Sequence, residues 1–404
     1  MPARPVSPPG PTGPSVPLPN STPDGGVDAI SSGIARWVGS APLRELVARF
    51  GGRWPAGDLA TVLAGLDDFS AGQWDFRAGR ERPEAREPDL DDATAAQVHA
   101  AASALGLVRP RPPAQLRYAH LVVLGGLAHA CLRRVAYAAH LLHAGPGAQL
   151  APAGATGATG GVEVSGEVAV LGSYRPLSEV ERRTLADAGV SGCDTEVDAL
   201  DAAVRRSFGV SVPEVDDGLD AGHPHHSWSS RTYRPAGTPP VRVLAAPSSE
   251  PERRRAHTAD TQRFWAEHAQ LAPGDEVLLV TAPIYVPFQH CDALRTLAVP
   301  YGCEIETVGV DPTLPELVRL PEPTLTPGRY LQEIRSAIRS MRALYPTLPS
   351  TVDHDADGVR SAGPTRQPHD RPQAPGGARG QAGVVARTAS AKTSERCSKL
   401  RNRP

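Results

Sequence analysis

The stretch "DEVLLVTAPIYVPFQHCDALRTLAVPYGCEIETVGVDP", Asp275 to Pro312, contains two strand-like segments with a helix-like segment between them. Glu276–Thr281 is a short run of apolar and β-branched residues, which is typical of a buried strand. Pro283 ends that strand, and a helical pattern leads to a second strand over Glu304–Val310. Strand, helix and strand in this order predict a parallel pair joined by a right-handed crossover.

The same order occurs three times earlier in the chain. Apolar strands precede helical patterns in "AHLVVLGGLAHACLRRVAYAAHLLHAG", "GEVAVLGSYRPLSEVERRTLADAG" and "VRVLAAPSSEPERRRAHTADTQRFWAEHAQL". Strands that alternate with helices of this length favour a parallel sheet covered on both faces. We therefore predict a Rossmann-like doubly wound parallel sheet of about five strands, an α/β fold, over residues 111–345.

Three further regions flank this domain. Residues 27–110 have apolar residues at helical spacing and predict a small helical N-terminal region. Residues 1–26 are rich in proline, which removes backbone donors and fixes φ, so we expect a disordered lead. Residues 346–404 should be a disordered tail, with a net charge of +7 from residue 371 onward. A solvated tail is the favoured interpretation, and weak contact with nucleic acid or another anionic surface is the alternative.

Composition narrows the class of protein. The chain has 404 residues and a formal charge of -2, and no apolar run reaches the roughly 18 residues of a membrane helix. Its five cysteines have no Cys-x-x-Cys spacing, so neither a disulfide framework nor a zinc site is indicated. We expect a soluble cytoplasmic protein with reduced thiols.

Ligands of doubly wound sheets bind beyond the carboxyl ends of the strands, where the strand order reverses. Four turns then become site candidates: Gly125-Gly126, Gly172 to Arg175, Ala246 to Ser249, and Thr281 to Pro283. Gly125 and Gly126 permit close backbone approach, and the amides of the next helix favour an anion. A third glycine and a ribose-binding acid are both missing, so a classical NAD or FAD site is unsupported. The alternative is a tight turn without a ligand.

Gly172 and Ser173 open a turn that ends in a guanidinium. Arg175 could clamp a phosphate or a carboxylate with two parallel hydrogen bonds. Its alternative is an ion pair with Glu179 or Glu181, which follow at the start of the next helix.

The remaining candidates also lie at helix starts or strand ends. Glu196 in the first turn of a helix capped by Thr195 complements the helix dipole, and a catalytic role is the alternative. Thr258 and Asp260 are cap-type residues that could instead bond to a ligand, together with the neighbouring Thr261. The Thr281 hydroxyl can face the cleft and Tyr285 can stack on a ligand, unless Tyr285 only packs.

"GHPHHSW" holds the histidine cluster His223, His225 and His226. The segment is rich in Gly, Pro and Ser, so an ordinary loop is favoured over a metal site. We predict no metal.

The strand-end motifs resemble those of a family of bacterial Rossmann-like proteins that includes YdcF, SanA and ElyC. The matching segments are "VVLGG" (122–126), "VLGSYR" (170–175), "DTEVDAL" (194–200), "HTADT" (257–261) and "LLVTAPIYVPF" (278–288). The resemblance covers about residues 118–312. Asp260 and Thr261 stand where the family has Glu-Asn, and Tyr285 and Phe288 stand where it has His and Arg. The resemblance implies a small-molecule ligand, with S-adenosylmethionine as the example given by YdcF.

We therefore expect a nucleotide-like or anionic small molecule, S-adenosylmethionine among them, in the cleft of residues 125–285. If the protein is an enzyme, transferase or hydrolase chemistry is the default, with Arg175 as anion clamp and Asp260 as base. One alternative is a non-enzymatic partner-binding protein with a degenerate cleft. Another is metal-dependent hydrolysis at the histidine cluster.

Overall fold

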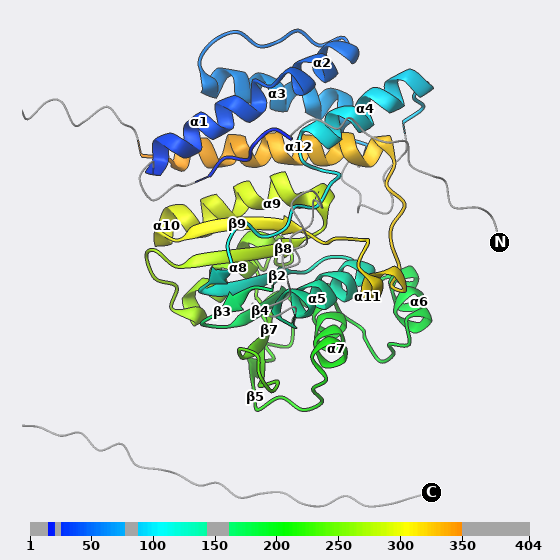
Figure 1. Ribbon diagram of the computed structural model, residues 1–404, viewed down its shortest axis with the longest axis vertical. Coiled ribbons are helices and arrows are strands. Elements are labelled where there is room, and N and C mark those ends of the chain that lie inside the picture. Colours follow the sequence, from blue (N-terminus) through cyan, green and yellow to red (C-terminus); the bar gives the residue numbers. More distant parts are fainter. Residues whose placement is uncertain (1–14, 21–25, 77–87, 144–160, 350–404) are drawn as a thin grey trace, which may run out of the picture. The chain divides into compact units, whose positions relative to one another are not determined.

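The computed structural model describes residues 15–20, 26–76, 88–143 and 161–349, and a seven-stranded sheet lies at its centre (Figure 1). The strand order is β5-β6-β7-β4-β2-β8-β9. These strands are β2 (His120–Leu124), β4 (Val168–Gly172), β5 (Val215–Leu219), β6 (Trp228–Tyr233), β7 (Val241–Ala245), β8 (Glu276–Thr281) and β9 (Glu304–Gly309). A separate parallel pair consists of β1 (Arg117–Tyr118) and β3 (Glu163–Val164).

The five strands from β7 to β9 in this order are parallel, and they are the five expected from the sequence. In their register, Val122 of the central strand β2 pairs with Ala169 on one side and with Leu279 on the other. The hairpin of β5 and β6 was not expected. It adds two antiparallel strands at the β7 edge, so the sheet is mostly rather than wholly parallel.

Helices cover both faces of the sheet (Figure 1). One face packs on α5 (Ala128–His143) and α7 (Glu196–Phe208), and the other on α8 (Thr258–Ala269) and α9 (Val286–Ala293). Outside these helices, α6 (Glu179–Asp187) packs on α5, and α12 (Pro327–Leu344) packs on α9. Side chains alternate between the faces, as the two-residue period of a strand requires. Leu121 and Val123 contact the first group, whereas Val122 and Leu124 contact the second.

The expected helical N-terminal region is present and packs on α12. Its helices are α1 (Gly26–Val38), α2 (Ala41–Arg49), α3 (Leu59–Trp74) and α4 (Asp92–Ala104). Fully buried Trp37 and Trp74 share one hydrophobic cluster with Ile334 of α12 and with strand residues of the sheet. An ion pair of 2.7 Å between Arg342 and Asp67 also joins α12 to α3. The helices and the sheet thus belong to one compact unit.

Residues 15–20 differ from the expected disorder of the first 26 residues. The backbone N–H of Val16 donates to the carbonyl of Ala104 at 2.7 Å, and Pro19 is buried beside Gly33 of α1. Proline-rich backbone forms few hydrogen bonds with itself, so it can pack where helices supply partners. The other residues of the lead, and the basic tail from residue 350, lie outside the described ranges.

The shorter elements connect these layers. They are the 3₁₀ turns Pro283–Tyr285 and Tyr345–Thr347, the π-helical turn Leu294–Ala298, α10 (Val299–Tyr301) and α11 (Pro315–Val318). In the described ranges, none of the helices is long and apolar enough to cross a membrane.

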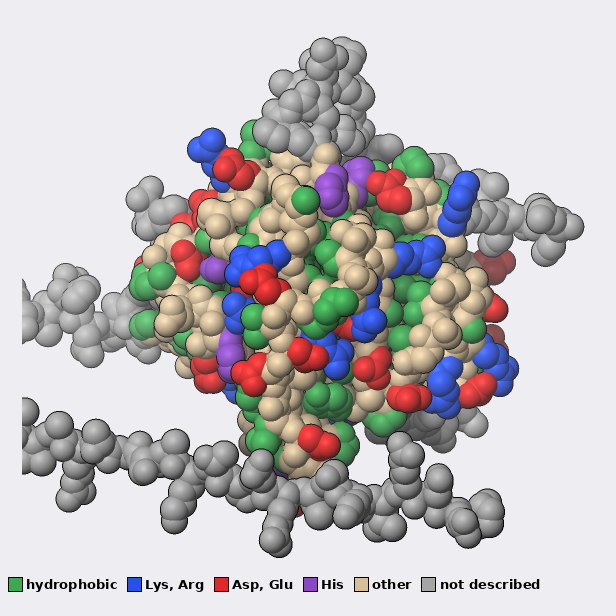
Figure 2. All heavy atoms as spheres, turned by 90° about the horizontal axis from the view of Figure 1, so that it is seen from below, with side chains coloured by type: hydrophobic (Ala, Val, Ile, Leu, Met, Phe, Trp, Pro, Cys, Tyr) green, Lys and Arg blue, Asp and Glu red, His purple; other side chains and the backbone are tan. Residues whose placement is uncertain are grey.

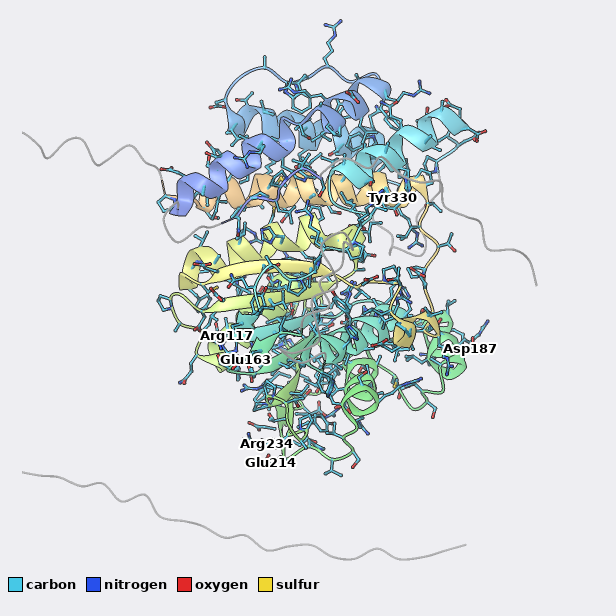
Figure 3. All side chains as sticks on the ribbon, in the orientation of Figure 1. Arg117, Glu163, Asp187, Glu214, Arg234 and Tyr330 are labelled. Carbon is cyan, nitrogen blue, oxygen red and sulfur yellow. The ribbon has the colours of Figure 1, made fainter. Side chains whose placement is uncertain are left out.

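The surface carries charges of both signs. Figure 2 shows acidic and basic side chains interspersed with hydrophobic ones on the face seen there. Figure 3 labels two of the ion pairs, Arg117 with Glu163 at 3.0 Å between β1 and β3, and Arg234 with Glu214 at the β5–β6 hairpin. Exposed pairs of this kind add little stability, so the fold rests mainly on the two hydrophobic clusters.

Candidate functional site

A cavity of about 240 Å³ lies at the carboxyl ends of β2 and β4. The strands that follow β2 in the chain, β4 and then β7, lie on one side of it, and the later strands β8 and β9 lie on the other side. The strand order therefore reverses at β2, beside this cavity. Its walls come from the turns after β2, β4 and β8 and from the loop between β7 and α8. This is the position expected for a ligand in such a sheet.

Eight of the ten candidate residues line the cavity. They are Gly125, Gly126, Gly172, Ser173, Arg175, Glu196, Thr258 and Tyr285. Asp260 and Thr281 do not line the cavity. Asp260 precedes the lining residue Thr261 in the sequence, and Thr281 is hydrogen-bonded to the lining residue Gln289. The turn from Ala246 to Ser249 does not line it either, and its place is taken by Arg255, Ala256 and His257 from further along the same loop.

Gly125 lies against a buried carboxylate. A Cβ atom at this position would be 2.6 Å from Oε1 of Glu196 and 2.7 Å from the carbonyl oxygen of Leu171. Real Cβ atoms do not approach other atoms so closely, so only glycine fits here. The close approach brings the turn after β2 directly onto the first turn of α7.

Glu196 is the acidic side chain among the described lining residues. It opens α7, whose N-cap is Thr195, as expected; Thr195 and Asp198 form a capping box. Ser173 Oγ donates a hydrogen bond of 2.7 Å to Oε2 of Glu196. Burial raises the pKa of the Glu196 carboxyl and outweighs the opposing charges of Arg175, Arg255 and Arg134 and the bond from Ser173. Three arginines and one buried carboxyl therefore line the same cavity.

Arg175 is held by the protein. Its Nη1 and Nη2 donate to the two oxygens of Glu181 at 3.0 and 2.8 Å, and Nη2 also donates to the carbonyl of Gly126 at 2.9 Å. Burial opposes ionisation of Glu181, but the bonds from Arg175 and Ser178 hold its pKa at about 2. The ion-pair alternative for Arg175 is confirmed. The guanidinium still lines the cavity and is fixed in position there.

Two further arginines were not among the candidates. Arg134 of α5 is 1% exposed and donates to the carbonyls of Leu124 and Gly125 at 2.7 and 2.5 Å. Its guanidinium carbon lies 5.5 Å from the ring centroid of Tyr285, a cation–π contact. Arg255 reaches the cavity from the β7–α8 loop. The signal for Arg134 is its position, next to Arg133, in a mostly apolar helix eight residues after Gly126.

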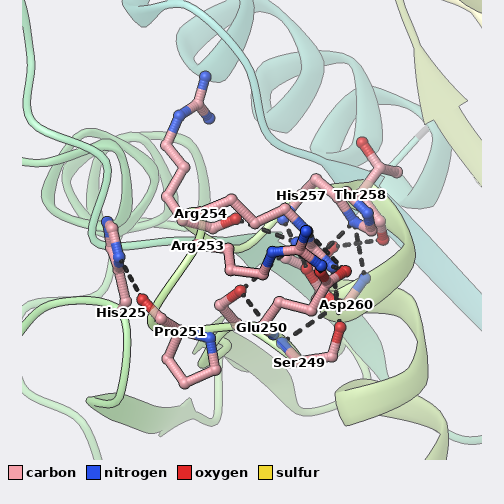
Figure 4. Close-up of polar contacts among 12 residues, drawn as sticks. His225, Ser249, Glu250, Pro251, Arg253, Arg254, His257, Thr258 and Asp260 are labelled. Carbon is pink, nitrogen blue, oxygen red and sulfur yellow. Dashed lines mark hydrogen bonds and ion pairs between the residues drawn. The ribbon is translucent and has the colours of Figure 1, made fainter.

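Asp260 secures the β7–α8 loop rather than lining the cavity (Figure 4). The backbone N–H of His257 donates to its Oδ2 at 2.9 Å, and Arg254 Nη1 donates to the same oxygen at 2.5 Å. Burial opposes ionisation, but hydrogen bonds from Arg254 and Ser249 hold its pKa at about 2. A carboxylate so acidic and so fully bonded does not suit a general base near neutral pH. The N-cap of α8 is His257 rather than Thr258.

Thr281 faces into the protein. It is 0% exposed, and its hydroxyl donates to Oε1 of Gln289. Gln289 in turn lines the cavity together with Thr261 and Phe288. Thr281 therefore supports the site through Gln289 instead of contacting a ligand directly.

The histidines of the cluster contact each other and the neighbouring loop residues Pro251 and Glu252. The rings of His223 and His225 are 4.6 Å apart, His225 Nδ1 lies 2.9 Å from the carbonyl of Pro251, and His226 pairs with Glu252 at 3.2 Å. Across the part of the chain that the structure describes, no group of three or more His, Cys, Asp or Glu side chains could hold a metal ion.

The chain has relatives in mycobacteria. A family model described as "Rv3785 N-terminal domain" matches residues 21–106, which hold helices α1 to α4. "Uncharacterized protein Rv3785" of Mycobacterium tuberculosis (strain ATCC 25618 / H37Rv) is 33% identical over 347 residues, which cover 77% of this chain and 88% of the relative. "Uncharacterized protein Mb3814" of Mycobacterium bovis is similar to the same extent. No solved structure matches the chain. The identity and the coverage show that the chain belongs to the Rv3785 family.

Proposed function

We propose that this protein binds a small anionic molecule of the nucleotide type in the cavity at the ends of β2, β4 and β8. The observation that carries the proposal is the convergence of Arg134, Arg175 and Arg255 on one cavity. Guanidinium groups bind phosphate and carboxylate oxygens through paired, charge-assisted hydrogen bonds.

Helix starts add to the positive potential. The first residues of α7 and α8, Glu196 and Thr258, line the cavity, as do Leu127 and His129 around the start of α5. The amides in the first turn of a helix carry a partial positive charge, which favours an anion. Burial lowers the pKa of His129 to about 4, so this histidine is neutral at pH 7 and adds no charge.

A Rossmann-like assignment of the sheet supports the same proposal. When the five parallel strands are numbered by their order in the chain, their order across the sheet is 3-2-1-4-5. Doubly wound nucleotide-binding sheets have this order, with the ligand at the reversal beside the first strand. The resemblance to the YdcF, SanA and ElyC family points the same way and adds S-adenosylmethionine as a ligand to test.

The size of the cavity limits how much of a ligand it encloses. Sites that bury a drug-sized molecule have volumes of about 300–1,000 Å³, and this one has about 240 Å³. We therefore place the anionic group inside, beside the arginines, and the rest of the molecule at the opening. For S-adenosylmethionine the enclosed group is its carboxylate. If the protein catalyses a reaction, Glu196 is better placed than Asp260 to act as acid or base.

A thermal-shift screen of the full chain tests the proposal. The ligands are S-adenosylmethionine, adenosine mono-, di- and triphosphates, sugar nucleotides, and inorganic phosphate and sulfate. A ligand at 100 times its dissociation constant stabilises the folded state by about 2.7 kcal/mol. Arg255→Gln should lose most of this effect, whereas Arg253→Gln, in the same arginine run but at an exposed site, should keep it. Stabilisation by none of these ligands contradicts the proposal.

One observation favours a second candidate. Arg175 is already paired with Glu181, and Arg134 is bonded to backbone carbonyls, so the protein itself satisfies part of the site. The second candidate is a non-enzymatic protein that acts through a protein partner and has a cleft filled by its own side chains. For this candidate, no ligand should stabilise the protein in the thermal-shift screen. A partner protein should bind the wild-type chain and Arg255→Gln with equal affinity. Under either candidate we place the protein in the cytoplasm, where cysteines such as Cys131 stay reduced.

A further inference from the structure

The carboxyl of Glu196 lies where an anion would bind. It lines the cavity together with all three arginines, only 8% of its surface is exposed, and the charges of the arginines act on it. The missing side chain of Gly125 leaves room for Oε1 on one side, and Ser173 Oγ bonds to Oε2 on the other. A negative ligand beside the arginines is therefore also beside Glu196, and two negative charges in a buried space repel each other.

Every element around Glu196 contributes charged or titratable groups. The neighbours are Arg134, His129 and Cys131 from α5, Arg175 from the turn after β4, Glu181 from α6, and Arg255 and His257 from the β7–α8 loop. Burial lowers the pKa of His129 to about 4 and raises the pKa of the Cys131 thiol to about 12. Neither group changes its charge between pH 6 and pH 9.

The charges of these neighbours decide which anion fits. The three arginines with ionised Glu181 and Glu196 leave a net charge of +1, and protonation of Glu196 raises it to +2. A phosphoryl group carries about -1.5 to -2 at pH 7. A carboxylate ligand carries one negative charge, which the net charge of +1 already balances while Glu196 stays ionised. A protonated Glu196 can also donate a hydrogen bond to a phosphoryl oxygen, which an ionised carboxylate cannot.

Building on the proposed function, we infer that the enclosed group is a phosphoryl dianion and that Glu196 takes up one proton from solvent when it binds. The proton removes the repulsion between the two anions and supplies a donor. Ser173 keeps the side chain in place through the transfer, because a hydroxyl can bond to either form of the carboxyl. Ligands with a phosphate at this position are then preferred over S-adenosylmethionine.

Isothermal titration of the full chain with sulfate tests this inference. Sulfate stays a dianion from pH 6 to pH 9, so a change in affinity over this range comes from the protein. Titration in buffers of different ionisation enthalpy counts the protons taken up. Above pH 7.5, where a histidine of ordinary pKa is already neutral, we expect uptake to approach one proton per sulfate. The sulfate affinity should fall by up to tenfold per pH unit over the same range.

Variants identify the group that takes up the proton. Glu196→Gln resembles the protonated form, so it should bind sulfate at pH 8.5 at least tenfold more tightly than the wild type and without proton uptake. Glu179→Gln makes the same change at an exposed site on α6 and should leave both measurements unchanged. If Glu196→Gln does not fold, the proton count in the wild type alone decides.

The outcomes separate the inference from the proposed function. Sulfate binding with a constant affinity above pH 7.5 and no proton uptake overturns the role of Glu196 and leaves an anion site. Acetate binding as tightly as sulfate assigns the site to carboxylates, which also overturns the inference. Binding of no anion and no nucleotide to either the wild type or Glu196→Gln overturns both the inference and the proposed function.

Discussion

The carbonyl oxygen of Pro19 lies 2.5 Å from Nε2 of His290, which stands 271 residues later in the chain. A carbonyl can only accept, so Nε2 carries the proton, and Nδ1 of the neutral ring accepts from the hydroxyl of Thr307 at 3.0 Å. His290 is only 3% exposed. This one neutral side chain joins the N-terminal segment to α9 and β9.

Acid should weaken the fold through His290. Burial lowers the pKa of His290 to about 4, although the bond to Pro19 opposes this shift. An unfolded chain has a histidine pKa of about 6.5, so it binds a proton at a higher pH than the folded chain does. The stabilisation is therefore complete above about pH 6.5 and is lost as the pH falls toward 4, by up to about 1.4 kcal/mol per pH unit.

Urea denaturation at pH 7.5, 6 and 5 measures this dependence. His290→Gln should be less stable at pH 7.5 and should lose less stability between pH 6 and pH 5 than the wild type. Buried His129 remains, so a smaller slope persists. His268→Gln, on the exposed side of α8, should keep the wild-type slope. Equal slopes in all three proteins would contradict the role of His290.

Gly33 lets the N-terminal segment approach α1. A Cβ at this position would be 2.6 Å from Cα of Pro19, so Gly33→Ala must displace residues 15–20 or the helix. Overpacking of this kind costs about 1–3 kcal/mol. Gly72 in α3 has no atom within 4 Å of its Cβ position, so Gly72→Ala should stabilise by up to about 1 kcal/mol. Denaturation midpoints that move in the same direction for both variants would argue against a packed segment.

Arg254 holds the loop that presents Arg255. It bonds to Asp260, Ser249 and Glu250, and Asp260 is almost fully buried beneath it. Arg254→Gln leaves that carboxylate without its charged partner and should cost about 1–3 kcal/mol of stability. Because the loop is released, it should also weaken anion binding. Arg253 is exposed, so Arg253→Gln should change stability by less than about 0.5 kcal/mol and leave binding intact, as measured by denaturation and titration.

The parallel strands were predictable because each is a short apolar run before a helical pattern. The β5–β6 hairpin was not, because Val215–Leu219 reads "VDDGL", which contains residues that are rare in strands, and all five are exposed. Pairing with β6, rather than burial, forms this strand. Local composition does not report such pairing.

The candidate site was predictable where it depends on backbone turns. Glycine after a buried strand marks a close approach, and Gly125, Gly126 and Gly172 all line the cavity. Side-chain direction was not predictable. Asp260 stands at the correct helix start but points to Arg254, whereas Arg255 reaches the cavity because the loop folds back. These directions depend on contacts between distant segments.

Gly125 and Gly126 should respond differently to the same substitution. In Gly125→Ala the new methyl carbon would lie 2.6 Å from Oε1 of Glu196 and 2.7 Å from the carbonyl oxygen of Leu171. Both distances are shorter than Cβ contacts in proteins. The turn must move away from α7, so we expect a loss of stability of about 1–3 kcal/mol and a large loss of anion affinity. In Gly126→Ala the nearest atoms are Cβ of Ala130 and the Arg134 guanidinium at 3.4 Å, so both properties should change little. Sulfate titration and urea denaturation of both variants measure the contrast, and Gly125→Ala binding sulfate like the wild type would place the anion elsewhere.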